Sequence, residues 1–281
     1  MISPLPDILI DPVVRAALIE DLGRAGDVTA AACLPAGEQV TAVFAARQEG
    51  RLAGIDCVRL AIAAMDPKAR FEALKADGDD LAPGDVIARV SGEARAILTA
   101  ERTALNLLSR LCGVATLTRA YVRAVEGTGA RIVCTRKTTP GLRALEKYAV
   151  RCGGAVNHRF GLDDAILIKD NHIAACGGVA KAMERAKAAA GHLMKIEIEV
   201  DTLAQLEDAL PFAPDVILLD NFALADLKTA VARVAGAVVL EASGGVNLTT
   251  VRAIAETGVD TISVGALTHS APILDVGLDI N

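Results

Sequence analysis

Basic side chains are concentrated in one stretch of an otherwise acidic chain. Two short apolar runs within it end in charged residues, TRK at 135–137 and KDNH at 169–172. This pattern is typical of parallel strands that deliver side chains to one rim of a sheet. Arg binds planar carboxylates through two parallel hydrogen bonds, and Lys adds a point charge. The stretch therefore favours a site for a polyanionic acid over a merely solvated basic face.

Polar residues also follow the later apolar strands. They are Glu199, Asp220, the phrase EASGG at 241–245 and the pair Gly265-Ala266. Two carboxylates from neighbouring strands suit Mg²⁺, which combines one or two carboxylates with substrate oxygens. They also suit a positive charge that develops on a sugar ring. Glycine-rich turns can present backbone N–H groups to a phosphate. The residue types therefore indicate a phosphorylated sugar beside a polyanionic acid.

The elements that must position these side chains alternate between strand and helix. Strands are expected at 132–134, 165–168, 195–200, 216–219, 237–240 and 261–264, with helices at 141–150, 178–190, 203–210, 224–234 and 248–256. Strands separated by helices are parallel, and the later ones recur at the length of a βα-barrel unit. Six strands fall short of eight. The pattern therefore predicts an incomplete barrel, with a doubly wound open sheet as the alternative.

The first part of the chain follows a different pattern, in which short strands and turns lie between helices. Helices are expected at 12–22, 57–65, 99–111 and 116–125, and strands at 41–46 and 53–55. Gly113 is expected to end the third helix. The domain boundary is placed there, which gives an N-terminal domain of residues 1–113 and a barrel-like domain of residues 114–268.

Composition excludes several classes of function. The chain has 281 residues, a net charge of −6, 2% aromatic residues and no Trp, which argues against nucleic acid as a partner. The N-terminus has no signal-peptide pattern, and no apolar run approaches a membrane span. The six cysteines lack zinc-ligand spacing and are typical of buried thiols in a reducing cytoplasm. We therefore expect a cytoplasmic protein that binds neither membrane nor nucleic acid.

Taken together, the motifs resemble one family, the quinolinate phosphoribosyltransferases, also called nicotinate-nucleotide pyrophosphorylases (carboxylating). The resemblance spans nearly the whole chain. The matching phrases are EDLGRAGDVT at 20–29, ERTALNLL at 101–108, TRKTTPGLR at 135–143, EKYAV at 146–150, NHRFGL at 157–162, LIKDNH at 167–172, EVD at 199–201, LDN at 219–221, EASGG at 241–245 and SVGALTHS at 263–270. Their common order makes the set far more specific than any single motif.

The resemblance implies a reaction, a fold and an assembly. Phosphoribosyl would pass from phosphoribosyl pyrophosphate to quinolinate with decarboxylation, giving nicotinate mononucleotide, pyrophosphate and CO₂ for NAD synthesis, with Mg²⁺ as cofactor. The fold would be that of a type II phosphoribosyltransferase, an N-terminal α/β open sandwich followed by an incomplete βα-barrel-like domain. Residues 269–281 would return to the first domain. The protein would form a homodimer or an assembly of dimers with shared active sites.

The resemblance also implies which residues form the site. Quinolinate would meet Thr135, Arg136, Lys137, His158, Arg159 and Lys169, together with the partner subunit's Arg102. The ribose and Mg²⁺ would face Glu199 and Asp220. The 5-phosphate would meet Ser243, Gly244, Gly245, Val264, Gly265 and Ala266, with His269 nearby. The catalytic candidates are Lys137, Lys169, Glu199 and Asp220.

Three other interpretations stay open at this point. One is the homologous protein of bacterial molybdenum-transport operons, a group that tends to lack the phrase LIKDNH, which is complete here at 167–172. Another is a nicotinate-specific transferase, which has only one carboxylate to hold and needs fewer basic residues. The last is a non-catalytic phosphosugar-binding protein, which would not need Glu199 and Asp220 opposite a cationic cluster.

Overall fold

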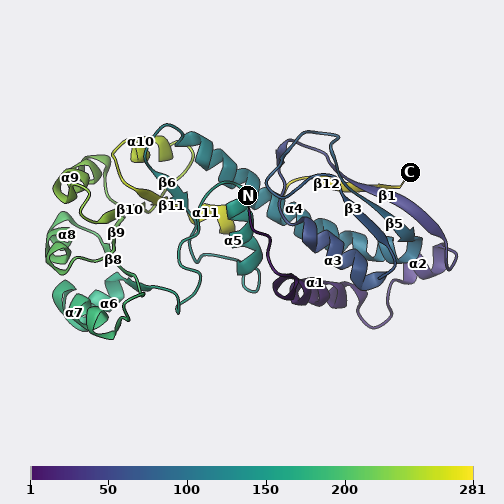
Figure 1. Cartoon of the computed structure of the whole chain (residues 1–281), viewed down its shortest axis with the longest axis horizontal. Coiled ribbons are helices and arrows are strands. Elements are labelled where there is room, and N and C mark those ends of the chain that lie inside the picture. Colours follow the sequence, from purple (N-terminus) through teal and green to yellow (C-terminus); the bar gives the residue numbers. More distant parts are fainter. Residues whose placement is uncertain (1, 281) are drawn as a thin grey trace. The chain divides into compact units, whose positions relative to one another are not determined.

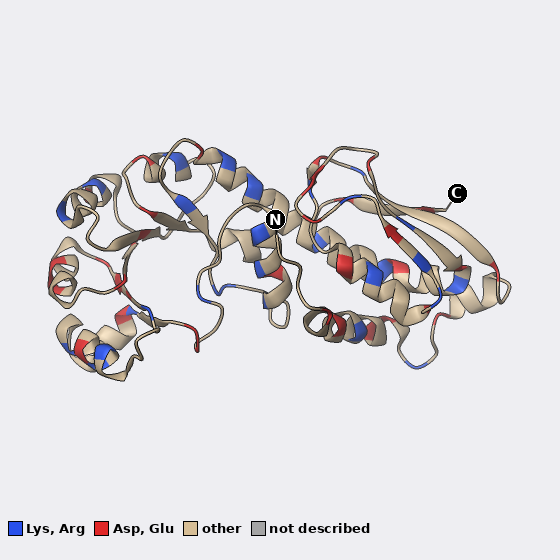
Figure 2. Ribbon diagram, in the orientation of Figure 1, with Lys and Arg blue, Asp and Glu red and all other residues tan. Residues whose placement is uncertain are grey.

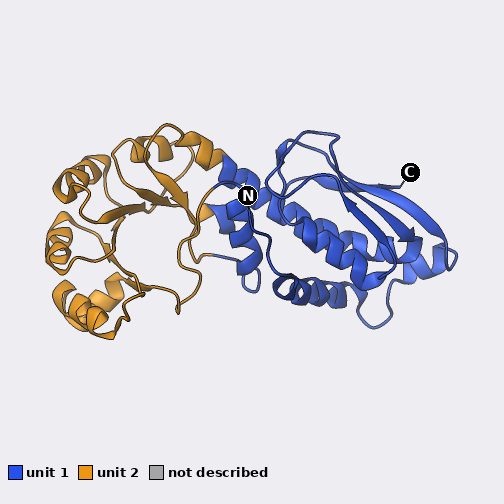
Figure 3. Ribbon diagram, in the orientation of Figure 1, with its two compact units in different colours: residues 1–119, 138–154, 267–281 blue, residues 120–137, 155–266 orange. Residues whose placement is uncertain are grey.

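The computed structural model describes residues 2–280, which divide into two compact units (Figures 1 and 3). Unit 1 contains residues 1–119, 138–154 and 267–281, and unit 2 contains residues 120–137 and 155–266. The chain therefore contributes three separate stretches to unit 1. Among the described residues, no helix combines the length and the apolar character that crossing a membrane requires.

Unit 1 is built on an antiparallel sheet of four strands in the order β12-β1-β5-β3. Figure 1 shows helices on one side of this sheet. The strands are β1 (Gln39–Ala46), β3 (Arg70–Ala73), β5 (Val86–Glu93) and β12 (Val276–Ile280), and the helices are α1 (Asp7–Leu22), α2 (Val28–Cys33), α3 (Ile55–Met65) and α4 (Ala94–Ala124). The short strands β2 (Gly50–Arg51) and β4 (Asp80–Leu81) form a separate pair. Side chains of β1 and β5 such as Phe44, Ile87 and Val90 are buried, which gives the sheet one apolar face against the helices.

Two expectations for this part of the chain are wrong. Gly113 does not end a helix, because the two predicted helices are one continuous 31-residue helix, α4. A Cβ atom on Gly113 would lie 1.9 Å from the carbonyl oxygen of Pro272, so the glycine permits a close backbone approach instead. Residues 53–55 form no strand, since α3 already begins at Ile55 after Gly54, whose φ is 95°.

Helix α5 (Arg143–Cys152) and the C-terminal segment both belong to unit 1. The Arg110 guanidinium on α4 donates to the fully buried carboxylate of Glu146 on α5 at 2.8 Å. The Tyr148 hydroxyl donates to Asp77 at 2.8 Å. The segment after α11 (Ala266–His269) ends as β12, which pairs antiparallel with β1. Buried polar contacts and strand pairing thus hold both segments on unit 1.

Unit 2 is a parallel sheet of six strands in the order β6-β11-β10-β9-β8-β7. The predicted fold class, with an incomplete βα-barrel-like domain, is confirmed. The strands are β6 (Arg131–Val133), β7 (Ile166–Ile168), β8 (Ile196–Val200), β9 (Val216–Asp220), β10 (Val239–Ser243) and β11 (Thr261–Ser263). The helices are α6 (Asp170–Cys176), α7 (Val179–Ala189), α8 (Leu203–Ala209), α9 (Leu224–Val234) and α10 (Val251–Ala255). Figure 1 shows helices α7 to α10 along the outer side of the curved sheet. Because the strands are parallel, their carboxyl ends share one rim.

Candidate active site

A pocket of about 430 Å³ opens at the carboxyl ends of the strands of unit 2. Its walls carry most of the polar side chains that the sequence placed at strand ends, and Figure 2 marks the basic and acidic segments of this unit. The lining residues are Thr135, Arg136, Lys137, His158, Arg159, Leu167, Lys169, Glu199, Leu218, Asp220, Glu241, Ser243 and Ser263. The structure thus brings the predicted cationic residues and the predicted carboxylates together in one cavity.

One wall of the pocket is cationic. Arg136 and Lys137 follow β6, and Arg159 lies on the connection that leads to β7. The Arg159 guanidinium donates through Nη1 to the carbonyl of Ala165 at 2.9 Å, while its buried Nε has no acceptor among the described residues. Burial lowers the pKa of Arg159, and the neighbouring charge of Arg136 lowers it further. Two crowded guanidiniums with a buried unused donor favour the entry of an anion.

Another part of the pocket wall, the acidic wall, carries the two carboxylates. Glu199 is on β8 and Asp220 ends β9, and these strands are neighbours in the sheet. Lys169 Nζ donates to Glu199 Oε2 at 2.5 Å, and Asn221 Nδ2 donates to Asp220 Oδ2 at 2.6 Å. The ion pair between Lys169 and Glu199 connects the cationic wall with the acidic wall, a link that the sequence did not reveal.

The remainder of the phrase LIKDNH has a local structural role. Lys169 is the N-cap residue of helix α6, and its backbone N–H donates to Nδ1 of His172 at 2.9 Å. A side chain at the third helical position that accepts from the N-cap backbone satisfies a donor that the helix leaves unpaired. His172 therefore fixes the start of α6, and Lys169 is left at the rim of the sheet.

The turn after β10 has a geometry that only glycine readily adopts. Gly244 has a φ of 94° and Gly245 a φ of 60°. A Cβ atom on Gly244 would lie 2.1 Å from Oδ1 of Asn221, whose own φ is 55° and whose backbone N–H donates to the Ser243 carbonyl at 2.9 Å. The turns after β9 and β10 are thus fitted against each other.

The helix after this turn begins later than expected. The sequence placed its start at residue 248, whereas α10 runs from Val251 to Ala255. Asn247 explains the delay, because its side-chain oxygen accepts from the backbone N–H groups of Thr249 and Thr250 at 2.9 and 3.1 Å, which forms a turn before the helix. Val264, Gly265 and Ala266 follow β11, which lies next to β10 in the sheet. The two predicted phosphate-binding loops therefore come from adjacent strands.

Two buried carboxylates of these strands have no predicted binding or catalytic role, although Glu241 begins the strand-end phrase EASGG and lines the pocket. Glu197 and Glu241 are 7% and 5% exposed. Burial, and next the charge of Glu197, raise the pKa of Glu241 to about 7. The alternation in the strand sequence IEIEV at 196–200 is the signal for Glu197, since side chains two positions apart share one face of a strand.

Arg102 and His269 belong to unit 1, so their predicted roles remain predictions. Arg102 is exposed on α4. Nδ1 of His269 lies 2.6 Å from the hydroxyl of Ser270.

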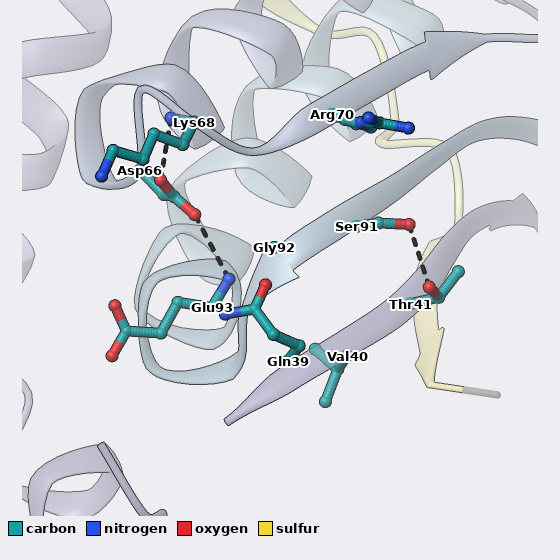
Figure 4. Close-up of a pocket in the computed structure, with 9 residues that line it drawn as sticks. All are labelled: Gln39, Val40, Thr41, Asp66, Lys68, Arg70, Ser91, Gly92 and Glu93. Atoms are coloured by element: carbon teal, nitrogen blue, oxygen red, sulfur yellow. Dashed lines mark hydrogen bonds between the residues drawn. The ribbon is translucent and has the colours of Figure 1, made fainter. Parts of the chain in front are cut away.

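Unit 1 has a larger hollow of about 590 Å³ on its sheet, which contains none of the predicted site residues (Figure 4). Asp66 at its edge accepts from the backbone N–H groups of Lys68 and Glu93 at 2.9 and 3.2 Å, and these bonds lower its pKa. Thr41 and Ser91 bond to each other at 2.9 Å. These polar groups already satisfy one another, so we place the active site at the rim pocket of unit 2 despite its smaller volume.

Comparison with known proteins decides the family. A family model described as "Quinolinate phosphoribosyl transferase, N-terminal domain" matches residues 27–112, and the corresponding C-terminal domain matches residues 114–279. The chain belongs to the quinolinate phosphoribosyltransferase family. The resemblance that the sequence motifs indicated is therefore confirmed.

Relatives in the family match almost the full length of the chain. The nicotinate-nucleotide pyrophosphorylase (carboxylating) of Mycobacterium leprae is 48% identical and covers 95% of each chain. A probable enzyme of the same name from Bacillus subtilis is 45% identical over 93% of this chain and 90% of its own. The solved structure of the nicotinate-nucleotide pyrophosphorylase from Francisella tularensis superposes with a TM-score of 0.95 at 40% identity, covering 100% and 99% of the two chains.

Proposed function

We propose that the rim pocket of unit 2 is where this chain joins quinolinate to the ribose of phosphoribosyl pyrophosphate. The chain is a phosphoribosyltransferase of NAD biosynthesis, and its products are nicotinate mononucleotide, pyrophosphate and CO₂. The observation that carries the site assignment is that one cavity holds a cationic wall and two rim carboxylates, Glu199 and Asp220. A dicarboxylic acid and a ribose need such walls of opposite charge.

The cationic wall is the proposed binding site for the two carboxylates of quinolinate. Arg136, Lys137 and Arg159 lie there, and the buried Nε of Arg159 offers a donor that a substrate oxygen can use. Lys169 lies between this wall and Glu199. Charge-assisted hydrogen bonds of this kind are stronger than neutral ones, especially away from water. The acid would therefore be held with its ring nitrogen directed toward the sugar.

The carboxylate wall is the proposed site of the ribose. When pyrophosphate leaves, positive charge develops on the ribose ring, and the fixed charges of Glu199 and Asp220 stabilise it. The pyridine nitrogen then bonds to the anomeric carbon. The positive ring nitrogen stabilises the carbanion left when the adjacent carboxylate departs as CO₂, and the carbanion takes up one proton. Lys137 and Lys169 are the candidates to assist this second step, because both reach the cationic wall.

The same carboxylates fit the proposed Mg²⁺. Glu199 and Asp220 supply oxygen donors on neighbouring strands in a pocket open to substrate, which matches the preference of Mg²⁺ for one or two carboxylates and substrate oxygens. When bound, the ion would neutralise charge on the departing pyrophosphate. The turn at Ser243, Gly244 and Gly245, with Val264 to Ala266 on the adjacent strand, would hold the 5-phosphate through backbone N–H groups.

A product assay tests the proposal. The purified chain, incubated with quinolinate, phosphoribosyl pyrophosphate and Mg²⁺, should release CO₂ and form nicotinate mononucleotide in equal amounts. Chelation of the metal should stop both. Binding of phosphoribosyl pyrophosphate without turnover would favour a phosphosugar-binding protein, and turnover of nicotinate but not of quinolinate would favour a nicotinate-specific transferase.

We also propose that the protein is a homodimer, or an assembly of dimers, with shared active sites. The support is the exposed position of Arg102 on α4 in unit 1, together with the family resemblance. Two polyanionic substrates gain from one more cation when they leave water. The expected cytoplasmic location likewise stays a proposal, supported by the four buried free thiols of Cys57, Cys112, Cys134 and Cys152.

Mixing two inactive variants should restore activity if Arg102 acts in the partner's site. Arg102→Ala and Lys137→Ala homodimers should each be nearly inactive. A mixed dimer would combine both lesions in one site and leave the other intact, so random exchange between the two variants should recover about a quarter of the wild-type activity. The measurement is steady-state turnover after proven subunit exchange. No recovery under those conditions would exclude action in trans.

A further inference from the structure

Three side chains meet at the wall of the pocket and form what we call the buried cluster, namely His158, Glu197 and Glu241. Nε2 of His158 lies 2.9 Å from Oε2 of Glu197 and 3.6 Å from Oε1 of Glu241. Both glutamates are buried in the interior of unit 2, on strands β8 and β10. Buried carboxylates are costly unless something in the protein needs them there.

The hydrogen bonds of the buried cluster define the state of the imidazole ring. The backbone N–H of Arg159 donates to Nδ1 of His158 at 2.7 Å. A nitrogen that accepts a hydrogen bond carries no proton, so the ring proton is on Nε2, which points to Glu197. Both ring nitrogens of His158 therefore face protein groups, although the residue also lines the pocket. This arrangement differs from direct binding of a substrate carboxylate by a ring N–H group.

The same three residues also have the donor types of a divalent metal site, since their ligand atoms lie within 4.8 Å of one another. The hydrogen bond at Nδ1 argues against that use. A metal on Nε2 would require the proton to be on Nδ1, where it would meet the N–H of Arg159 instead of an acceptor. The geometry therefore favours a hydrogen-bonded support over a metal site.

We propose that Glu197, backed by Glu241, is a positioning residue for the acid substrate, because it holds the His158 ring and thereby the Arg159 segment in the arrangement that receives a carboxylate. This inference rests on the proposed role of the pocket in binding quinolinate. It assigns His158 to the support of Arg159 and leaves contact with the substrate to Arg159 itself.

Arg159 gains from such a support because a second guanidinium, that of Arg136, lines the same pocket. The charge of Arg136 opposes that of Arg159, whereas Glu197 favours it. A second cavity of about 440 Å³ is lined by Arg159 and His158 and also by Asp215 at the amino end of the sheet. Released from the buried cluster, the Arg159 side chain would have space in that cavity, where Asp215 already pairs with Lys195 at 2.5 Å. Glu197 and His158 keep it at the rim.

The test compares two substitutions at Glu197 in the full chain. Glu197→Leu removes the acceptor, whereas Glu197→Gln keeps an oxygen for His158 and can donate its amide N–H to Glu241. Calorimetric titration with quinolinate should give a Kd at least about tenfold higher for the Leu variant, the size of one lost positioning hydrogen bond. The Gln variant should recover most of the affinity. Affinity for phosphoribosyl pyrophosphate should stay within about twofold in both, since its site is the other wall. Glu184→Leu, at an exposed glutamate on α7, is the matched control.

A double-mutant cycle separates support from direct binding. If His158 acts only with Glu197, adding His158→Leu to Glu197→Leu should not raise the Kd for quinolinate further, and the KM for quinolinate should follow the same pattern. A further rise of tenfold or more in the Kd for quinolinate would make His158 a direct ligand of quinolinate and overturn the inference. Three other results would also overturn the inference. The first two are unchanged affinity of Glu197→Leu for quinolinate, and a loss of affinity in Glu197→Gln equal to that in Glu197→Leu. The third is a metal bound in stoichiometric amount to the wild-type protein and absent from Glu241→Gln. If Glu197→Leu fails to bind phosphoribosyl pyrophosphate, the same cycle is run with Glu197→Met, which fills the buried volume without offering an acceptor, and the same pattern is expected. Wild-type protein that binds no quinolinate would refute the proposed function as well.

Discussion

Nicotinate should be used at least about a thousandfold less efficiently than quinolinate, because a site built for a polar group rejects an analogue that lacks it. Nicotinate has one carboxylate fewer, so it would compensate less of the positive charge of the crowded pair Arg136 and Arg159. The burial of Arg159 Nε makes that mismatch costly. The measurement is kcat/KM for each acid, with mononucleotide formation as the common readout, since nicotinate releases no CO₂.

A variant of Arg159 provides the control for this discrimination. Arg159→Gln should reduce the efficiency with quinolinate far more than that with nicotinate, so the ratio between the two acids should narrow. Equal use of both acids by the wild-type protein would contradict the assignment of the cationic wall.

Asp220→Ala should lower kcat by at least about a hundredfold, the scale of one lost electrostatic stabiliser at the reacting centre. Asp220→Asn should lose nearly as much, although its side-chain oxygen can still accept from Asn221 as Asp220 does at 2.6 Å. Comparison of the Asp220→Ala and Asp220→Asn variants separates the effect of the Asp220 charge from its role in holding the turn. Affinity for quinolinate should change little, because Asp220 is on the sugar side. Asp226→Ala on the exposed face of α9 is the control.

Glu199→Ala should reduce kcat by a similar factor, yet it differs in one respect. The substitution also releases Lys169, whose ammonium is 2.5 Å from Glu199. Affinity for quinolinate should therefore change in the Glu199 variant and not in the Asp220 variant. If quinolinate binding collapsed in Asp220→Ala while turnover at saturation survived, the two walls of the pocket would be wrongly assigned.

The location of the site could be predicted because it depends on local patterns. Each strand of unit 2 is a short apolar run, and each is followed by the residues that the chemistry needs, from Arg136 through Glu199 to Ser243. Parallel strands necessarily bring their carboxyl ends to one rim. A regular alternation of strand and helix therefore brings residues far apart in sequence into one pocket. This grouping can be predicted even when the contacts between the residues are not known.

Features that depend on close approach between distant segments needed the tertiary structure. Gly113 follows the rule for a helix stop, but its missing side chain makes room for the backbone at Pro272. The late start of the helix after the Gly244 turn is a different case, because the turn that Asn247 forms with Thr249 and Thr250 is local. The outcome at Gly113 follows from competition between local preferences and a contact that the sequence order does not display.

The sequence by itself determined the fold class, the family and the rim residues, because periodicity and strand ends are local signals. Only the tertiary structure decided how those residues are paired and supported. Glu197 and Glu199 alternate identically in the strand sequence, yet one is buried against His158 and the other meets Lys169 at the rim. The physical reason is that burial and hydrogen bonding depend on atoms brought in by other strands, so the depth of a side chain cannot be derived from its place along one strand.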